Sequence, residues 1–160
     1  MKQLVRLSAL LVAVVCCSAI PAHASDFFGV FAIVDKVTFE PATGDRPDRI
    51  VITGLFAISK QQPGDQYDAP QRGYMYFKLG DKADQARREW NDLKSLAGKK
   101  EVVAFGAKYE PKGRVRKADE KAENPDVYQP SQGLLRVRTD SDFIAVKALR
   151  EASKDASATK

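Results

Sequence analysis

The segment 30–39 reads VFAIVDKVTF, and its β-branched and aromatic residues are typical of a β-strand. In the two-residue alternation of such a strand, Val30, Ala32 and Val34 share one parity. Val37 and Phe39 take the other, so the alternation breaks at Asp35-Lys36. A break of this kind predicts a β-bulge. A long strand with a bulge is what a small barrel needs where a strand passes from one part of the sheet to the other.

The rest of the chain alternates between strand-like segments, turns and one strongly amphipathic helix. We expect further strands at 49–59, 72–79, 101–109 and 133–138, a helix between the N-cap Asp81 and the stop Gly98, and a terminal helix at 143–152. Gly54 interrupts the second strand and predicts a kink there. Trp90 lies in the middle of the apolar stripe of the first helix, and we expect it in the core. The intervening segment 110–132 is expected to be one long charged connection.

The predicted order is strand, strand, strand, helix, strand, strand, which makes the protein mainly β. This order resembles the OB-fold, a five-stranded, partly open barrel with a helix between its third and fourth strands. The resemblance covers residues 28–138 and leaves the terminal helix as an addition to the barrel. An antiparallel β-sandwich with one helix is the alternative fold.

The N-terminus has the three parts of a secretory signal peptide. Lys2 and Arg6 form a basic region, residues 7–19 form an apolar run, and residues 22–24 read AHA, a small-residue cleavage site. The apolar run is too short for a permanent transmembrane helix, and no later segment is as long. Together with the barrel, this pattern resembles a small exported bacterial protein, processed by the general secretory route and periplasmic or secreted.

Processing is directly testable. We expect the intact mass of the exported protein to correspond to a chain that begins at Ser25, because cleavage follows the AHA site. Electrospray mass spectrometry of protein recovered from outside the cytoplasm measures this. A chain that instead begins at a lipid-modified Cys16 or Cys17 contradicts the prediction.

Cleavage would change which chemistry the chain can perform. It would remove two of the 26 basic residues, none of the 21 acidic residues, both cysteines and the only histidine, leaving 136 residues with a net charge of +3. Without His and Cys, Ser-His-Asp and Cys-His catalysis, zinc sites, haem attachment and thiol redox chemistry are excluded. No phosphate-binding glycine motif is present, and the Asp-containing loops do not match a calcium loop. We therefore expect a non-catalytic protein with no cofactor and no metal, and an enzyme that uses only carboxylates or a Ser-Lys pair is the last-ranked alternative.

One strand face carries a candidate binding surface. Alternation over 72–79 places aromatic and basic side chains on the outward face, namely Arg72, Tyr74, Tyr76 and Lys78. Such a row can stack a flat ligand and attract an anion, and in the OB-fold the face of strands two and three is a common binding surface. The alternative is that the tyrosines pack under the terminal helix with their hydroxyls at the rim.

The connection after the fourth strand holds the densest basic segment. Between residues 108 and 121 there are six basic and three acidic residues. The candidate ligand-binding residues in it are Lys112, Arg114, Arg116 and Lys117. The resemblance to the OB-fold implies that this loop can border the same cleft as the tyrosine row. The alternative is a solvated loop with no ligand.

These observations favour one domain with a binding function. We expect a single domain over 25–153 with a flexible tail at 154–160. The leading hypothesis is an exported, non-catalytic binding module for an anionic or flat polar ligand, and the alternative is an envelope accessory or protein-interaction subunit. Nucleic acid is an unlikely partner, because the chain is exported, and fold alone does not give function.

Overall fold

A computed structural model describes residues 28–59, 66–79, 82–106, 113–121, 125–130, 133–137 and 143–158. The elements in chain order are β1 (Phe28–Glu40), β2 (Arg49–Ile58), β3 (Gln71–Phe77), α2 (Ala83–Leu96), β4 (Val102–Gly106), β5 (Val127–Tyr128), β6 (Leu134–Arg136) and α3 (Ile144–Ala158). The expected signal peptide and Lys112 lie outside the described residues. The described part of the chain is mainly β with two helices, which confirms the predicted class.

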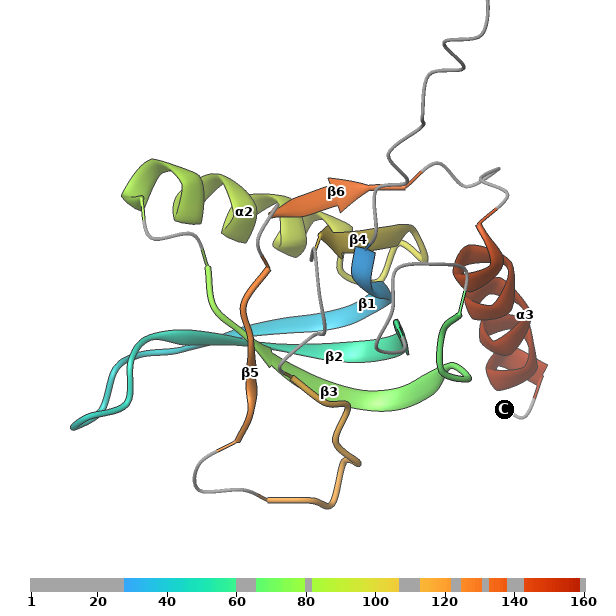
Figure 1. Cartoon of the computed structure of the whole chain (residues 1–160), viewed down its shortest axis with the longest axis horizontal. Helices are drawn as coiled ribbons and strands as arrows, with labels where there is room; N and C mark the ends of the chain where they lie inside the picture. The colour runs from blue at the N-terminus through green and yellow to red at the C-terminus, as the bar shows by residue number, and fades with distance from the viewer. Residues whose placement is uncertain are drawn as a thin grey trace, which may run out of the picture.

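All the described strands belong to one curled sheet in the order β5-β3-β2-β1-β4-β6. The β3–β5 pairing is parallel and the others are antiparallel. The sheet bends into a half-barrel with α2 at one end and α3 against its outside (Figure 1). This is an OB-fold-like β-barrel with a C-terminal helix, as predicted, whereas a β-sandwich requires two facing sheets.

The short segment that contains β5 and β6 connects the two edges of the curled sheet. β5 pairs with β3 at one edge, and β6, only a few residues later, pairs with β4 at the other (Figure 1). Inside, the rings of Phe77 and Phe105 lie 4.4 Å apart between centroids, and the Tyr128 hydroxyl donates a 3.0 Å hydrogen bond to the Phe105 carbonyl. The sequence predicted one long connection over 110–132. The structure differs from this prediction, because the segment contains β5. A two-residue strand is too short to show alternation in a sequence.

The bulge predicted in β1 is present. The register of β1 against β2 shifts between Val34 and Lys36, so Asp35 is the extra residue and stays exposed to solvent. Gly54 faces Val34 across the pair. A β-carbon on Gly54 would lie 2.1 Å from the Ile33 carbonyl oxygen, so the bent strand depends on glycine at this position.

α2 closes one end of the barrel. Leu93 and Leu96 are buried in the inner core, and the helix is followed by Gly98 with a φ of 78°, the stop predicted for it. Trp90 was expected in the core, but it is only partly buried and packs against the core from the edge. Trp90 is not fully buried because it lies at the edge of the barrel opening, where its ring contacts Phe39.

α3 packs on the outer face of the sheet. Its buried side chains contact the outward apolar residues of β1, β2 and β4, and the cluster includes Ala145, Val146, Leu149, Phe31, Leu55 and Val102. Two expectations are corrected here. Tyr74 and Tyr76 do not belong to this cluster, so the terminal helix does not cover them. Residues 154–158 continue α3 and are not a frayed tail, because no Gly or Pro interrupts helix formation.

Candidate functional site

The predicted outward row of β3 alternates as expected, since Gly73, Met75 and Phe77 face inward and are buried. At one end of the row, Arg72 remains 51 % exposed and forms an ion pair with Asp35 of the β1 bulge. At the other end, the backbone N–H of Lys78 donates to the Tyr128 carbonyl at 3.0 Å. The two tyrosines between these ends are covered by the chain itself.

Arg49 of β2 lies across the face of Tyr76, with its guanidinium carbon 4.0 Å from the ring centroid. Only 6 % of the Arg49 side chain is exposed, and its Nε donates a 2.8 Å hydrogen bond to Glu40. Arg46, in the β1–β2 loop, shares the same carboxylate at 3.2 Å. A cation held on an aromatic face and neutralised by a carboxylate is a stable arrangement. It fixes the β1–β2 loop to the outer face of β2 and β3.

Residues 113–121 cover Tyr74 from the other side. Tyr74 and Arg116 exchange two backbone hydrogen bonds of 3.0 and 2.9 Å, so the loop adds a short antiparallel bridge to β3. Gly73 makes this approach possible, because a β-carbon there would lie 2.0 Å from the Arg116 carbonyl oxygen. The Tyr74 hydroxyl donates to the carbonyl of Glu120, and Tyr74 meets Tyr76 edge to face at 5.7 Å.

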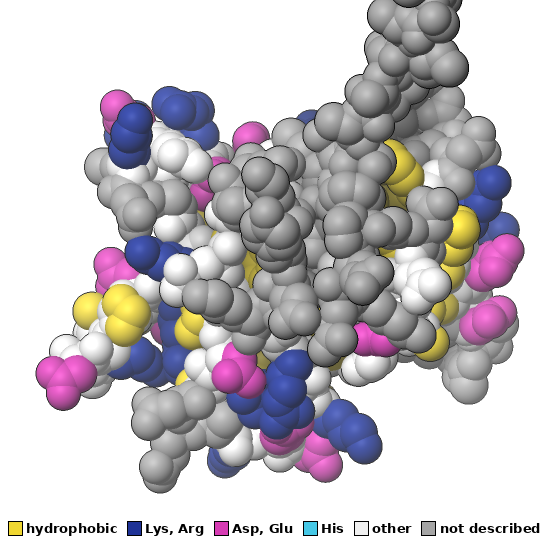
Figure 2. Space-filling view, in the orientation of Figure 1, with side chains coloured by type: hydrophobic (Ala, Val, Ile, Leu, Met, Phe, Trp, Pro, Cys, Tyr) yellow, Lys and Arg dark blue, Asp and Glu magenta, His cyan; other side chains and the backbone are white. Residues whose placement is uncertain are grey.

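Two arginines of the basic loop, Arg114 and Arg116, are neutralised by acidic residues nearby. Arg116 is 5 % exposed, and its Nη1 donates a 2.7 Å hydrogen bond to Glu120, while Asp126 lies 3.8 Å from its Nη2. Arg114 also forms an ion pair with Glu120. In Figure 2 this part of the surface shows basic and acidic side chains next to each other and not a uniform basic patch. The count of six bases against three acids therefore overstates the positive field of the loop.

The protonation equilibria follow from these contacts. Desolvation, with the neighbouring Tyr76 as a second cause, raises the pKa of Tyr74 above its usual value. Desolvation acts to raise the pKa of Glu120 as well, but the hydrogen bond from Arg114 and the charges of Arg114 and Arg116 outweigh it, so this pKa is lowered. Near neutral pH, Tyr74 is thus a neutral hydrogen-bond donor and Glu120 is an anion.

The structure brings together four of the eight residues predicted to form a site. Tyr74, Tyr76, Arg114 and Arg116 form one cluster, in which the loop lies directly on the tyrosines. Lys117 follows this cluster and is exposed to solvent. Arg49 occupies one face of Tyr76, so this cluster mainly holds the β1–β2 loop and the loop 113–121 in place. The space that is open to a ligand is a cleft beside the cluster.

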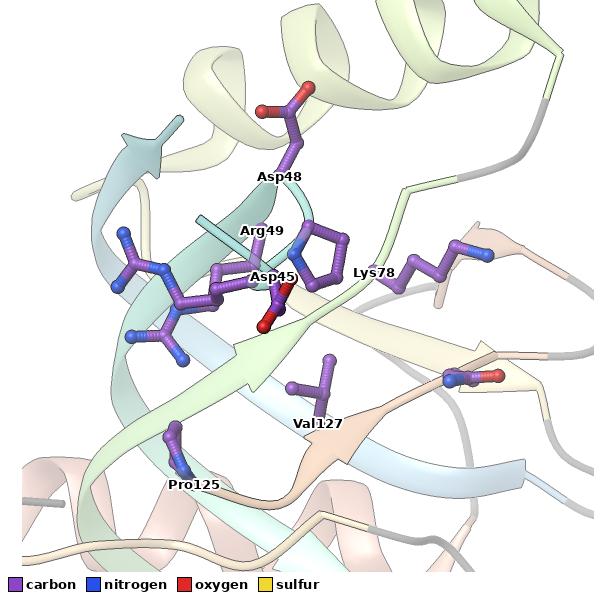
Figure 3. A pocket seen from close by; sticks show the side chains of 9 residues that line it. Asp45, Asp48, Arg49, Lys78, Pro125 and Val127 are labelled. Carbon is purple, nitrogen blue, oxygen red and sulfur yellow. The ribbon is translucent and has the colours of Figure 1, made fainter. Parts of the chain in front are cut away.

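A cleft of about 280 Å³ lies next to the cluster. It is lined by the loop residues 45–49, by Lys78 after β3, and by Pro125, Val127 and Gln129 around β5. Figure 3 shows Asp45 and Asp48 on the loop side, Val127 facing them from β5, and Lys78 and Pro125 toward opposite ends. The cleft is close to the size of small ligand pockets. It lies between the loop after β1 and the connection after β4, the two loops with which OB-folds hold ligands.

Of the predicted site residues that the structure describes, only Lys78 lines this cleft. Sequence reasoning missed Asp45 and Arg46, because residues 41–48 are rich in Pro, Gly and Asp, a composition typical of a turn. It missed Arg49 because this residue begins the strand predicted at 49–59. The available signal was the pair of arginines, Arg46 and Arg49, close to Glu40. Two arginines close in sequence to one glutamate indicate an ion-pair cluster as well as a turn.

The cleft offers polar groups of both signs and apolar walls. Lys78 can attract an anionic or acceptor group, Asp45 can accept a hydrogen bond, and Pro47 and Val127 present apolar surface to a flat ring. In the described ranges, no group of three or more His, Cys, Asp and Glu side chains is placed to hold a metal ion. Neither α2 nor α3 has the length and hydropathy needed to cross a membrane.

Comparisons with protein-family models, with curated proteins and with solved structures found no match to this chain.

Proposed function

We propose that the chain is an exported, non-catalytic binding module and that the cleft between the β1–β2 loop and β5 binds a small, flat, polar ligand with an anionic end. The observation that carries this proposal is the cleft itself, at the position where OB-folds bind their ligands. Export is supported by the signal-peptide pattern, and binding without catalysis by the residues that remain after cleavage.

The walls of the cleft are held before any ligand arrives. Arg49 anchors the loop side through Tyr76 and Glu40. The β5 side is anchored by Tyr128, whose ring is fully buried. A ligand that enters a pre-formed cleft loses less free energy to the ordering of side chains and loops. The same contacts explain why the tyrosine row need not touch the ligand in order to matter for binding.

The charges in the cleft favour a ligand with two different ends. Arg46 and Arg49 line the loop side of the cleft and share the single carboxylate of Glu40, so these three side chains keep a net positive charge. Lys78 and Asp45 also line the cleft. Lys78 favours a carboxylate or phosphate, and Asp45 favours a hydrogen-bond donor such as an amine. The flat part of the ligand fits against Pro47 and Val127.

A matched series of small probes tests this assignment. We expect 4-aminobenzoate to shift the backbone amide resonances of the non-proline residues in 45–49 and of residues 127–129 in two-dimensional NMR titrations. Benzoate, which lacks the amine, and 4-aminobenzamide, which lacks the charge, are expected to bind more weakly. Lys78→Gln should weaken 4-aminobenzoate binding about tenfold, equivalent to about 1.4 kcal/mol, and leave 4-aminobenzamide unchanged.

Lys117→Gln is the matched control, since it removes the same charge from an exposed position of the covering loop. It should leave both affinities within about twofold. Shifts that spread over other parts of the surface, or equal losses in the Lys78 and Lys117 variants, would show that the cleft is not the site. Native mass spectrometry of the protein from its own host then identifies the natural ligand by its mass.

A further inference from the structure

A second hollow lies at the mouth of the barrel, between the end of β1 and α2. It is a shallow, open hollow of about 330 Å³, lined by Phe39, Leu79, Ala86, Arg87 and Trp90. Phe39 is 44 % exposed although it is a large apolar side chain, and its ring meets that of Trp90 edge to face at 6.0 Å. We call this hollow the Phe39–Trp90 groove. Exposed aromatic rings beside a concave apolar surface are characteristic of a protein-binding site.

The charged residues on this side of α2 are cations. Arg87 precedes Trp90 by three residues and Lys94 follows it by four, so both project on the same side of the helix as Trp90. The ammonium of Lys94 lies 5.6 Å from the centroid of the Trp90 ring. Glu89 and Asp92, one residue before and two after Trp90, project on other sides. The groove therefore combines an apolar floor with a positive rim.

We propose that the Phe39–Trp90 groove docks an acidic segment of a partner protein, which inserts one apolar side chain between Phe39 and Trp90 and places carboxylates beside Arg87 and Lys94. The groove volume suits one or two side chains, and the rim charges select an acidic sequence. This interaction is separate from the ligand cleft. Lys78 faces the cleft, whereas Leu79, the next residue, lines the groove.

An anionic membrane surface is the other negatively charged partner that a positive rim attracts, and the geometry argues against it. A stable membrane anchor needs several protruding apolar side chains or an amphipathic helix. Among the described residues, the other exposed large apolar side chains are Phe143 and Ile144. They lie at the start of α3, which packs on the opposite face of the sheet. A single exposed ring beside a concave groove fits an inserted side chain better than a bilayer.

Trp90 provides the measurement, because it is the only tryptophan in the chain. The probes are two capped heptapeptides with one central leucine, flanked in one by glutamates and in the other by lysines. We expect the glutamate peptide to shift the tryptophan emission to shorter wavelength in a saturable way. Its affinity should exceed that of the lysine peptide at least tenfold at low salt, and this ratio should fall as salt screens the rim charges.

Substitutions at two neighbouring arginines distinguish the effect of charge at the groove rim from the effect of charge elsewhere on α2. Arg87→Glu should weaken binding of the glutamate peptide at least tenfold. Arg88→Glu makes the same charge change on the far side of the helix and should weaken it less than threefold. Phe39→Ser should also abolish the emission shift, and circular dichroism checks that each variant is folded. The 4-aminobenzoate affinity should stay unchanged in all three, which keeps this test independent of the ligand cleft.

Three results would overturn the proposal. One is the absence of any emission change with the glutamate peptide. Another is an equal loss of affinity in the Arg87 and Arg88 variants. The third is an emission shift with phosphatidylglycerol vesicles but not with the peptide, which would assign the groove to a membrane surface.

Discussion

Replacing Tyr128 with alanine is expected to lower the free energy of unfolding by about 3–5 kcal/mol. The side chain is 1 % exposed and packs edge to face against Phe77 and Phe105, with ring centroids 5.3 and 6.3 Å away. Its loss opens a cavity where β5 joins the two edges of the sheet. Urea unfolding followed by far-UV circular dichroism measures the change.

Tyr128→Phe separates the ring from the hydroxyl. The hydroxyl donates a 3.0 Å hydrogen bond to the Phe105 carbonyl, and burial raises the pKa of Tyr128, so the group is protonated and donates at neutral pH. Its removal should cost about 1–2 kcal/mol. Gln129→Ala, at the exposed next position, should change stability by less than about 0.5 kcal/mol. If Tyr128→Ala is as mild as Gln129→Ala, β5 does not close the barrel.

Loss of the Tyr128 side chain is expected to affect the proposed ligand site as well as the fold. Val127, which precedes Tyr128, lines the cleft, and β5 is held against β3 through only two residue pairs. A domain of this size is stable by about 5–15 kcal/mol, so a loss of 3–5 kcal/mol leaves much of the chain folded. The folded fraction of Tyr128→Ala should then bind 4-aminobenzoate more weakly, because one wall of the cleft is loosened.

The sequence predicted those parts of the fold that depend on local patterns. The break in alternation at Asp35 located the bulge, the alternation in β3 assigned its two faces, and Gly98 marked the end of α2. Each of these features is set by neighbouring residues. β5 was missed because two residues cannot display a period, and because its pairing with β3 depends on a contact between segments about 50 residues apart.

The candidate site shows the same division. Alternation placed Tyr74 and Tyr76 together on the outer face, but it could not show what covers them. Arg49 was counted only as the start of a strand, although it lies on the Tyr76 ring. The charge count of the basic loop also missed that one carboxylate, Glu120, holds both Arg114 and Arg116. Register and ion pairing across the sheet are long-range properties, and a single sequence does not display them.

Gly54→Ala is expected to destabilise the protein by about 3–4 kcal/mol, near the upper end for overpacking. The new β-carbon would lie 2.1 Å from the carbonyl oxygen of Ile33, a backbone atom that cannot rotate away as a flexible side chain would. Relief requires β1 and β2 to separate at the bulge. Gly98→Ala is the control, because a β-carbon there meets no atom within 4 Å and only the positive φ of 78° opposes it. That conformational cost is about 1–2 kcal/mol. The urea midpoints of both variants compare the cost of the steric clash with the cost of the backbone conformation. If Gly54→Ala is no less stable than Gly98→Ala, β1 and β2 do not approach this closely at the bulge.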